Sequence, residues 1–286
     1  MALNFLNRRN KDGKEEMSFV DHLEELRWHI MRSVIAIVIL GVTCFLYRDF
    51  LFDTIILGPI QNNFVTYDWF CRLGQKLGMG KSLCMPSMDI TMQATTFGGQ
   101  FLSSITISFV MGFIIAFPYI FWEFWKFLKP ALKPGELKNT KGAIFWVSFF
   151  FLVGVAFGYF LMAPFTFNFL ANFKIGTQNL IETKPTISDY IDNMMDITLG
   201  SGLAFELPVI SFVLTRIGLV TPKFLRDYRK YAYVALLMIA AIITPSPDWM
   251  SQTIVVVPLI CLYELSILVS MRVMKKVEQK DKEEWS

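Results

Sequence analysis

The acidic residue with the most unusual position is Glu206, which lies inside the apolar run from Met195 to Ile217. A helix rises 1.5 Å per residue, so a span that begins near Ile197 carries this carboxylate close to the middle of a bilayer core about 30 Å thick. An ionised carboxylate is costly at that depth unless it faces water, a cavity or a polar partner. We therefore expect Glu206 to meet a polar partner in the membrane, with a structural hydrogen bond between helices as the alternative.

Two further carboxylates lie beside apolar runs. Glu25 follows the segment Ser18 to Asp21, whose capping-box form predicts a helix that starts near Phe19. Glu136 ends a turn-forming segment that begins at Pro130. Carboxylates accept bidentate hydrogen bonds from guanidinium groups, so the pair predicts a patch for a cationic partner. The alternatives are a charged helix end for Glu25 and a cap on the next helix for Glu136.

Cys71 and Cys84 lie in a long segment between the first two apolar runs. The charge pattern described below places this segment outside the cytoplasm, where disulfides persist. Closing the loop between the two cysteines would contribute roughly 3 kcal/mol to stability. The sequence predicts a possible disulfide here, with two free thiols as the alternative. Cys44 and Cys261 fall inside apolar runs and are expected to pack as small hydrophobic side chains.

Several classes of chemistry have no recognisable residues in this chain. The sequence lacks a Gly-rich phosphate loop, the HExxH and GxSxG motifs, and it contains only two histidines, His22 and His29. A net charge of +3 is too small to indicate a nucleic-acid partner. We expect no enzyme activity, no metal or other cofactor and no nucleic-acid binding.

The elements that must position these residues are long and apolar. The 286 residues are 54% hydrophobic and 18% charged, below the roughly 25% charged residues of soluble chains, which predicts an all-α membrane protein. Six runs approach the roughly 20 residues that cross a bilayer. They are Trp28 to Tyr47, Phe101 to Phe127, Ile144 to Phe169, Met195 to Ile217, Tyr231 to Thr244, and Thr253 to Met271.

The last two runs differ from the others. The fifth run covers only about 21 Å as a helix, less than the core of about 30 Å. Either the membrane is thinner there or the last pair of helices is re-entrant.

The Lys and Arg residues predict the orientation. They gather in the N-terminal segment, the 129–143 and 218–230 loops and the C-terminal tail, so both termini are predicted to be cytoplasmic. The chain then divides into a flexible cytoplasmic segment, 1–17, a six-helix membrane domain, 18–271, and a charged cytoplasmic tail, 272–286. A long extracytoplasmic loop covers about residues 49–100.

Several motifs, taken in order, resemble those of the TatC family, the multi-spanning core of the twin-arginine protein translocase. The resemblance runs from about Ser18 to Met271. The matching residues are Phe19-Val-Asp-His-Leu-Glu-Glu-Leu-Arg27, Pro59, Phe127-Leu-Lys-Pro130-Ala-Leu132 with Glu136, Phe205-Glu206-Leu-Pro208, and Thr244-Pro-Ser-Pro-Asp248.

The resemblance implies a cup-shaped bundle of six helices with a short last pair, located in the cytoplasmic (inner) membrane and without catalytic chemistry. It implies that the chain recognises the paired arginines of signal peptides on folded cargo. TatA and TatB, single-span proteins, or one bifunctional TatA-like protein, are the implied partners. They would assemble with a homo-oligomer of this chain in a hetero-oligomeric complex, and the proton-motive force would drive export.

The resemblance also assigns roles to residues. Signal-peptide binding falls to Glu25 and Glu136, and the residues implied to shape that site are Arg27, Phe127, Pro130 and Leu132. Glu206 corresponds to a polar residue exposed in the concave face, where a partner helix docks. Pro59 and Asp248 match positions linked to transport, and the residues alone favour a helix-capping role for Asp248.

Two other functions are alternatives. A secondary transporter that moves a solute or proton through Glu206 would have an inverted repeat with broken helices, and the sequence shows no such symmetry. An intramembrane enzyme would need a further nucleophile, base or metal ligand at membrane depth, and none is evident.

Overall fold

The computed structural model describes residues 19–78, 84, 86, 88, 90–128, 142–173, 184–216, 218–244 and 249–284. Within these residues the fold is helical, apart from one isolated β-bridge between Gln93 and Thr186. Five helical segments are long and apolar enough to cross a membrane, which confirms the predicted all-α membrane fold. The five segments are Glu24–Leu46, Gly99–Leu128, Ile144–Asn172, Ile187–Arg216 and Gln252–Lys276.

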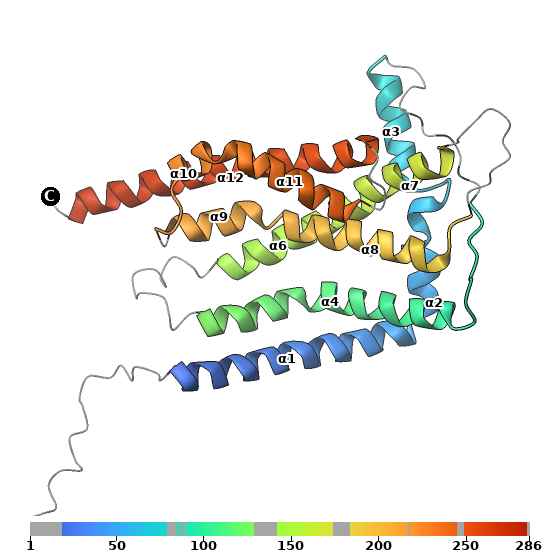
Figure 1. Cartoon of the computed structure of the whole chain (residues 1–286), viewed down its shortest axis with the longest axis horizontal. Coiled ribbons are helices and arrows are strands. Elements are labelled where there is room, and N and C mark those ends of the chain that lie inside the picture. Colours follow the sequence, from blue (N-terminus) through green and yellow to red (C-terminus); the bar gives the residue numbers. More distant parts are fainter. Residues whose placement is uncertain are drawn as a thin grey trace, which may run out of the picture.

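The spans stand side by side in a row (Figure 1). At one edge α1 (Phe19–Leu46) packs on α4 (Gly99–Leu128), and α4 packs on α6 (Ala143–Phe157) and α8 (Ile187–Ala204). At the other edge α9 (Leu207–Arg216) and α11 (Arg229–Ile243) both pack on α12 (Trp249–Glu284). The start of α1 and the end of α12 lie at the same end of the bundle, which we call the terminal end. The opposite end, the loop end, carries α2 (Arg48–Phe50) and α3 (Val65–Lys76).

The contact between α1 and α4 depends on a close approach of their backbones. A Cβ atom on Gly112 of α4 would lie 2.6 Å from the backbone nitrogen of Gly41 in α1. Small residues at such crossings allow membrane helices to gain van der Waals contact. The outer face of α1 remains exposed, for example at Val38, Ile39 and Val42, as expected for a helix at the edge of the row.

The third span is one continuous helical path with an irregular centre. It consists of α6, a π-helical segment, η4 (Gly158–Met162), and α7 (Ala163–Asn172). Pro164 is the second residue of α7, just after the π-helical segment. A proline has no N–H donor, and local changes of helical pitch let a membrane helix accommodate the bond that it removes. The predicted span from Ile144 to Phe169 is therefore present.

The fourth span begins earlier than predicted. The hydroxyl of Thr186 accepts a hydrogen bond from the backbone N–H of Asp189 at 3.1 Å, so α8 starts at Ile187 and not near Met195. An apolar run does not reveal a polar first turn of this kind, so the predicted start of the span was wrong. The helix is interrupted at Phe205 and Glu206, and α9 continues from Leu207 with Pro208 in its first turn, where a missing N–H costs little.

The last two helices differ in length. The fifth predicted span is short, because α11 has 15 residues. The prediction of a short last helix was wrong, since α12 has 36 residues and extends through the charged segment after Met271. Lys and Glu are strong helix formers, so the predicted tail prolongs the helix up to Glu284. The 218–230 loop contains one short helix, α10 (Pro222–Asp227).

The loop end is held by tyrosine hydroxyls. A turn formed by η1 (Leu51–Ile56) and η2 (Gly58–Ile60) follows α2. The hydroxyl of Tyr159 donates to the carbonyl of Ile55 at 2.7 Å, and that of Tyr190 donates to the carbonyl of Ile56 at 2.6 Å. Tyr67 of α3 donates to the carbonyl of Pro59 at 2.5 Å, and burial raises the pKa of the Tyr67 hydroxyl. Pro59 is fully buried in this turn.

A disulfide bond joins Cys71 of α3 to Cys84 across 13 positions of the loop. It ties α3 to the segment that leads back to α4. Cys44 is a buried free thiol, as expected, whereas Cys261 is exposed on α12.

Candidate functional site

Glu25 lies near the terminal end of α1, and its two carboxylate oxygens have different surroundings. Oε1 lies 3.8 Å from Nε2 of His29, one helical turn further along. Oε2 is shielded from solvent and has no hydrogen-bond partner among the described residues. The side chain as a whole is 35% exposed, so a ligand can reach it. A carboxylate with one unsatisfied oxygen is a ready acceptor for a cationic donor.

A second carboxylate, Glu123 of α4, lies beside this position and is only 1% exposed. Its Oε2 lies 2.6 Å from Nδ1 of His29, and its Oε1 accepts a hydrogen bond from Nζ of Lys126 at 3.0 Å. Arg32 Nη1 is 3.8 Å from Oε2. We call Glu25, His29, Arg32, Glu123 and Lys126 the terminal-end cluster.

His29 and Glu123 are not among the residues predicted for this site. A signal for each was present. Glu123 is an acidic residue inside the apolar run from Phe101 to Phe127, and His29 lies four positions after Glu25, on the same face of the helix. The local sequence pattern does not show that His29 and Glu123 are in contact, because they are 94 positions apart in the chain.

Of the residues predicted to shape the site, Phe127 joins the cluster and Arg27 does not. The ring of Phe127 meets the ring of His29 edge-on, with centroids 6.4 Å apart. Arg27 is two positions from both Glu25 and His29, more than half a helical turn away. It is exposed and lines a shallow groove on the outer face of α1 with Leu26 and Ile30.

Four predicted site residues lie outside the described residues. They are Pro130, Leu132, Glu136 and Asp248. Their predicted roles therefore stay predictions.

Glu206 lies at the break between α8 and α9, away from the terminal-end cluster. Contrary to the exposed position that the resemblance implies, its side chain is only 6% exposed. The cause is the close packing of α6 on α8, where a Cβ atom on Gly154 would lie 2.6 Å from the carbonyl oxygen of Ser201. Oε1 of Glu206 is buried without a hydrogen-bond partner among the described residues. Oε1 of Glu206 therefore forms no hydrogen bond to another described helix.

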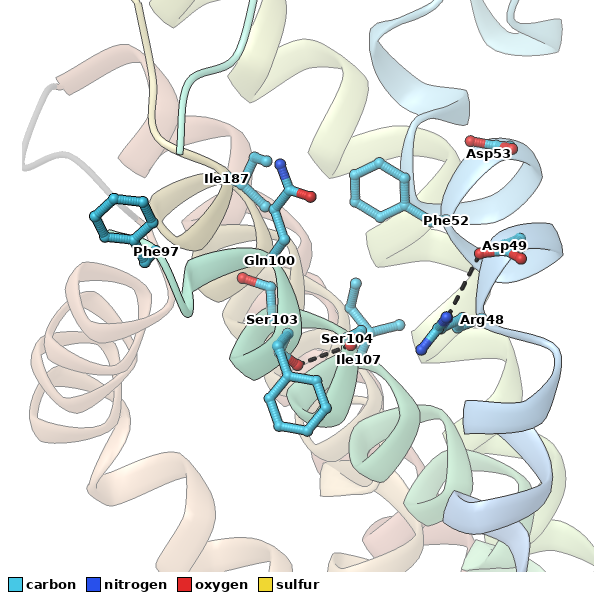
Figure 2. A pocket seen from close by; sticks show the side chains of 11 residues that line it. Arg48, Asp49, Phe52, Asp53, Phe97, Gln100, Ser103, Ser104, Ile107 and Ile187 are labelled. Atoms are coloured by element: carbon cyan, nitrogen blue, oxygen red, sulfur yellow. Dashed lines mark hydrogen bonds and ion pairs between the residues drawn. The ribbon is translucent and has the colours of Figure 1, made fainter. Parts of the chain in front are cut away.

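A pocket opens at the loop end, between the α2–η1 segment and α4 (Figure 2). Its volume is about 650 Å³, and its charged lining residues are Arg48, Asp49 and Asp53. Arg48 pairs with Asp49 at 3.6 Å. Glu206 does not line this pocket, so the pocket offers no link between the loop end and the intramembrane carboxylate.

Comparison with known proteins identifies the family. The family model of the Sec-independent protein translocase protein (TatC) matches residues 21–258. The chain belongs to the TatC family. A TatC protein from Blattabacterium sp. subsp. Periplaneta americana (strain BPLAN) is 40% identical over 269 residues, which are 93% of this chain and 99% of that relative. A TatC protein from Halalkalibacterium halodurans is 34% identical over 270 residues, covering 94% of this chain and 95% of the relative.

Solved structures agree with this assignment. A crystal structure of the twin-arginine translocase receptor TatC matches with a TM-score of 0.70 and 29% identity, and the match covers 88% of this chain and 99% of that one. The chain is therefore a multi-pass membrane protein of a translocase family, and the alternative of a secondary transporter is not supported. Among the described residues of this TatC chain, no three His, Cys, Asp or Glu side chains gather as a metal site.

Proposed function

We propose that this TatC chain is the receptor for twin-arginine signal peptides and the core of a translocase that exports folded proteins across the cytoplasmic membrane. The observation that carries the proposal is the partly exposed carboxylate of Glu25, which a ligand can reach and which has an oxygen without a hydrogen-bond partner among the described residues. The Lys and Arg distribution favours a cytoplasmic location for the terminal end, where this carboxylate lies.

The proposed recognition is a charge-assisted hydrogen bond. A guanidinium group presents planar pairs of donors that suit a carboxylate, and lysine offers only a point charge. Glu25 would accept one arginine of the pair, and Glu136 is the proposed acceptor of the other. Phe127, which packs on His29, would give the site an apolar wall.

The proposed partners act at a different place. The buried, unpartnered oxygen of Glu206 would accept a hydrogen bond from a polar group of a TatA- or TatB-type helix. Copies of the TatC chain would assemble with these partners into one complex. The sequence has no nucleotide-binding motif, so we propose the proton-motive force as the source of energy.

The test is a binding measurement with the full chain in lipid nanodiscs. A fluorescent signal peptide with two arginines is compared with the same peptide carrying two lysines. We expect Glu25→Gln to weaken binding of the twin-arginine peptide by roughly tenfold or more, because a hydrogen bond to a charged group contributes about 1.5–3 kcal/mol. Binding should also weaken as salt increases.

Glu24→Gln is the matched control, because Glu24 is the neighbouring acidic residue and is exposed. It removes the same charge from the same helix turn and should leave the affinity unchanged. Equal losses in both variants, or equal binding of the two peptides by the unmodified chain, would contradict the proposal.

A further inference from the structure

Glu123 is a buried carboxylate that the proposed recognition does not use. Both of its oxygens are engaged, Oε2 with His29 at 2.6 Å and Oε1 with Lys126 at 3.0 Å. With only 1% of the residue exposed, an arriving guanidinium has no access to it. Glu123 is therefore not a second receptor carboxylate, and its presence needs another reason.

Packing alone does not supply that reason. Burying a charge is costly, and a buried ion pair is often no more stabilising than apolar residues of the same volume. Here the partners of Glu123 are arranged around it from both helices. Lys126 of α4 is itself held over the ring of Trp122, 3.4 Å from its centroid, and Arg32 of α1 approaches to 3.8 Å. The carboxylate is thus fixed in place rather than merely tolerated.

His29 connects this fixed carboxylate to Glu25. Its Nδ1 faces Glu123 and its Nε2 faces Oε1 of Glu25, so the two carboxylates lie on opposite sides of one imidazole ring. A carboxylate on one ring nitrogen sets the orientation of the ring and the proton on that nitrogen. The edge of Phe127 packs against the same ring. The ring orientation then determines which edge of the imidazole lies 3.8 Å from Oε1 of Glu25.

We propose that Glu123 and His29 are positioning residues for peptide capture. Glu123 holds the imidazole of His29, and the imidazole lies at ion-pair distance from Oε1 of Glu25, which fixes the surroundings of the carboxylate that is proposed to accept a guanidinium donor. This inference rests on the proposed function of Glu25. It adds a buried pair on two different helices to the recognition site.

The first test measures capture of the twin-arginine peptide by the full chain in nanodiscs. Glu123→Gln keeps the shape of the side chain and removes its charge, and we expect roughly a tenfold loss of affinity, within the range of coupling between contacting residues. The matched control is Glu264→Gln, which breaks another ion pair between helices, that of Glu264 with Arg229 at 2.6 Å. The control should bind the peptide with unchanged affinity.

The second test reads His29 directly. Because the sequence has only two histidines, His22→Gln leaves a single histidine signal in a ¹⁵N-histidine NMR spectrum. We expect the twin-arginine peptide to shift the Nε2 resonance, the twin-lysine peptide to leave it in place, and Glu123→Gln to move the Nδ1 resonance before any peptide is added. A purely structural pair would not transmit peptide binding to the imidazole.

The outcomes separate the two proposals. If the unmodified chain does not prefer the twin-arginine peptide, the receptor function fails, and the positioning role fails with it. If that preference and the Glu25→Gln loss are present but Glu123→Gln binds normally, the positioning role alone is overturned. Should Glu123→Gln fail to insert, His29→Gln carries the same test, and normal capture by that variant overturns the inference.

Discussion

Three carboxylates in or beside the membrane spans have three different environments. Glu123 has partners on both oxygens, Glu25 has an imidazole on one oxygen and none on the other, and Glu206 has a buried oxygen without a partner among the described residues. Unsatisfied buried polar atoms are costly in a membrane. The oxygens of Glu25 and Glu206 that have no partner among the described residues are the acceptors that we propose for the signal peptide and the partner helix, and the saturated Glu123 is the proposed positioning residue.

A substitution at Glu206 should separate assembly from recognition. We expect Glu206→Ala to reduce co-purification of a single-span partner roughly five- to thirtyfold, because one hydrogen bond between membrane helices contributes about 1–2 kcal/mol. Capture of the twin-arginine peptide should be unchanged. The measurement is quantitative co-purification from membranes alongside the peptide-binding assay.

Ser201→Ala is the control for this prediction. Ser201 is a buried polar residue of the same span whose hydroxyl bonds to the carbonyl of Ile197 at 2.6 Å, so it needs no outside partner. Normal partner recovery with Glu206→Ala would count against the role that we give to Glu206.

At the scale of elements, the cluster depends on the crossing of α1 and α4. The hydrogen bond between His29 and Glu123 and the ion pair between Arg32 and Glu123 join these two helices near the terminal end. Gly41 and Gly112 meet further along the same interface. Since α1 lies at the edge of the row and packs chiefly on α4, any change in this crossing moves Glu25 relative to Phe127.

Gly112→Ala should therefore disturb both stability and capture. Its Cβ would lie 2.6 Å from a backbone nitrogen and 2.8 Å from a Cα atom of Gly41, so the backbones must separate. We expect a destabilisation of roughly 1–3 kcal/mol, typical of overpacking, together with weaker binding of the twin-arginine peptide. Thermal unfolding in detergent and the peptide assay measure the two effects.

The other glycine at the crossing provides the control. A Cβ on Gly41 would come no closer than 3.6 Å to any atom across the interface, which is ordinary contact. Gly41→Ala should be tolerated, although it adds the same methyl group to the same interface. Equal behaviour of the two variants would refute this account of the crossing.

At the scale of the whole molecule, the two ends of the bundle carry different structural features. The terminal end carries the charged cluster, while the loop end carries the disulfide and the tyrosine bonds to the η1–η2 turn. Pro59, which the resemblance links to transport, is buried in that turn and its carbonyl accepts the Tyr67 hydroxyl. Its position suits a role in holding the loop end together.

The proposed orientation predicts the outcome of reporter fusions. A reporter that is active only outside the cytoplasm should stay silent when fused after α12, because most of the Lys and Arg residues lie in the N-terminal segment, the 129–143 and 218–230 loops and the C-terminal tail of the sequence. The same reporter inserted at Gly78 should be active. Gly78 lies just beyond α3 at the loop end and has a positive φ of 73°, with no atom within 4 Å of an added Cβ. The reverse pattern would invert the topology.

Much of the fold could be predicted from local pattern. Apolar runs locate the spans because each must fill a bilayer of known thickness, and the short α11 follows from the length of its run. The start of α8 was missed because its first turn is polar and is set by the Thr186 cap. The length of α12 was missed because charged residues that leave the membrane can continue a helix.

The sequence by itself determined that this chain is a multi-spanning membrane protein, approximately where its spans lie, and that Glu206 stands out against an apolar background. Only the tertiary structure decided the surroundings of each acidic residue. Glu123 pairs with His29, which is 94 positions away in the chain, and Glu206 is buried and not exposed. The physical reason is that hydropathy and helical period act over one turn or one span. The partner of a buried carboxylate is set by which helices pack together, and that depends on close contacts such as the one between Gly41 and Gly112.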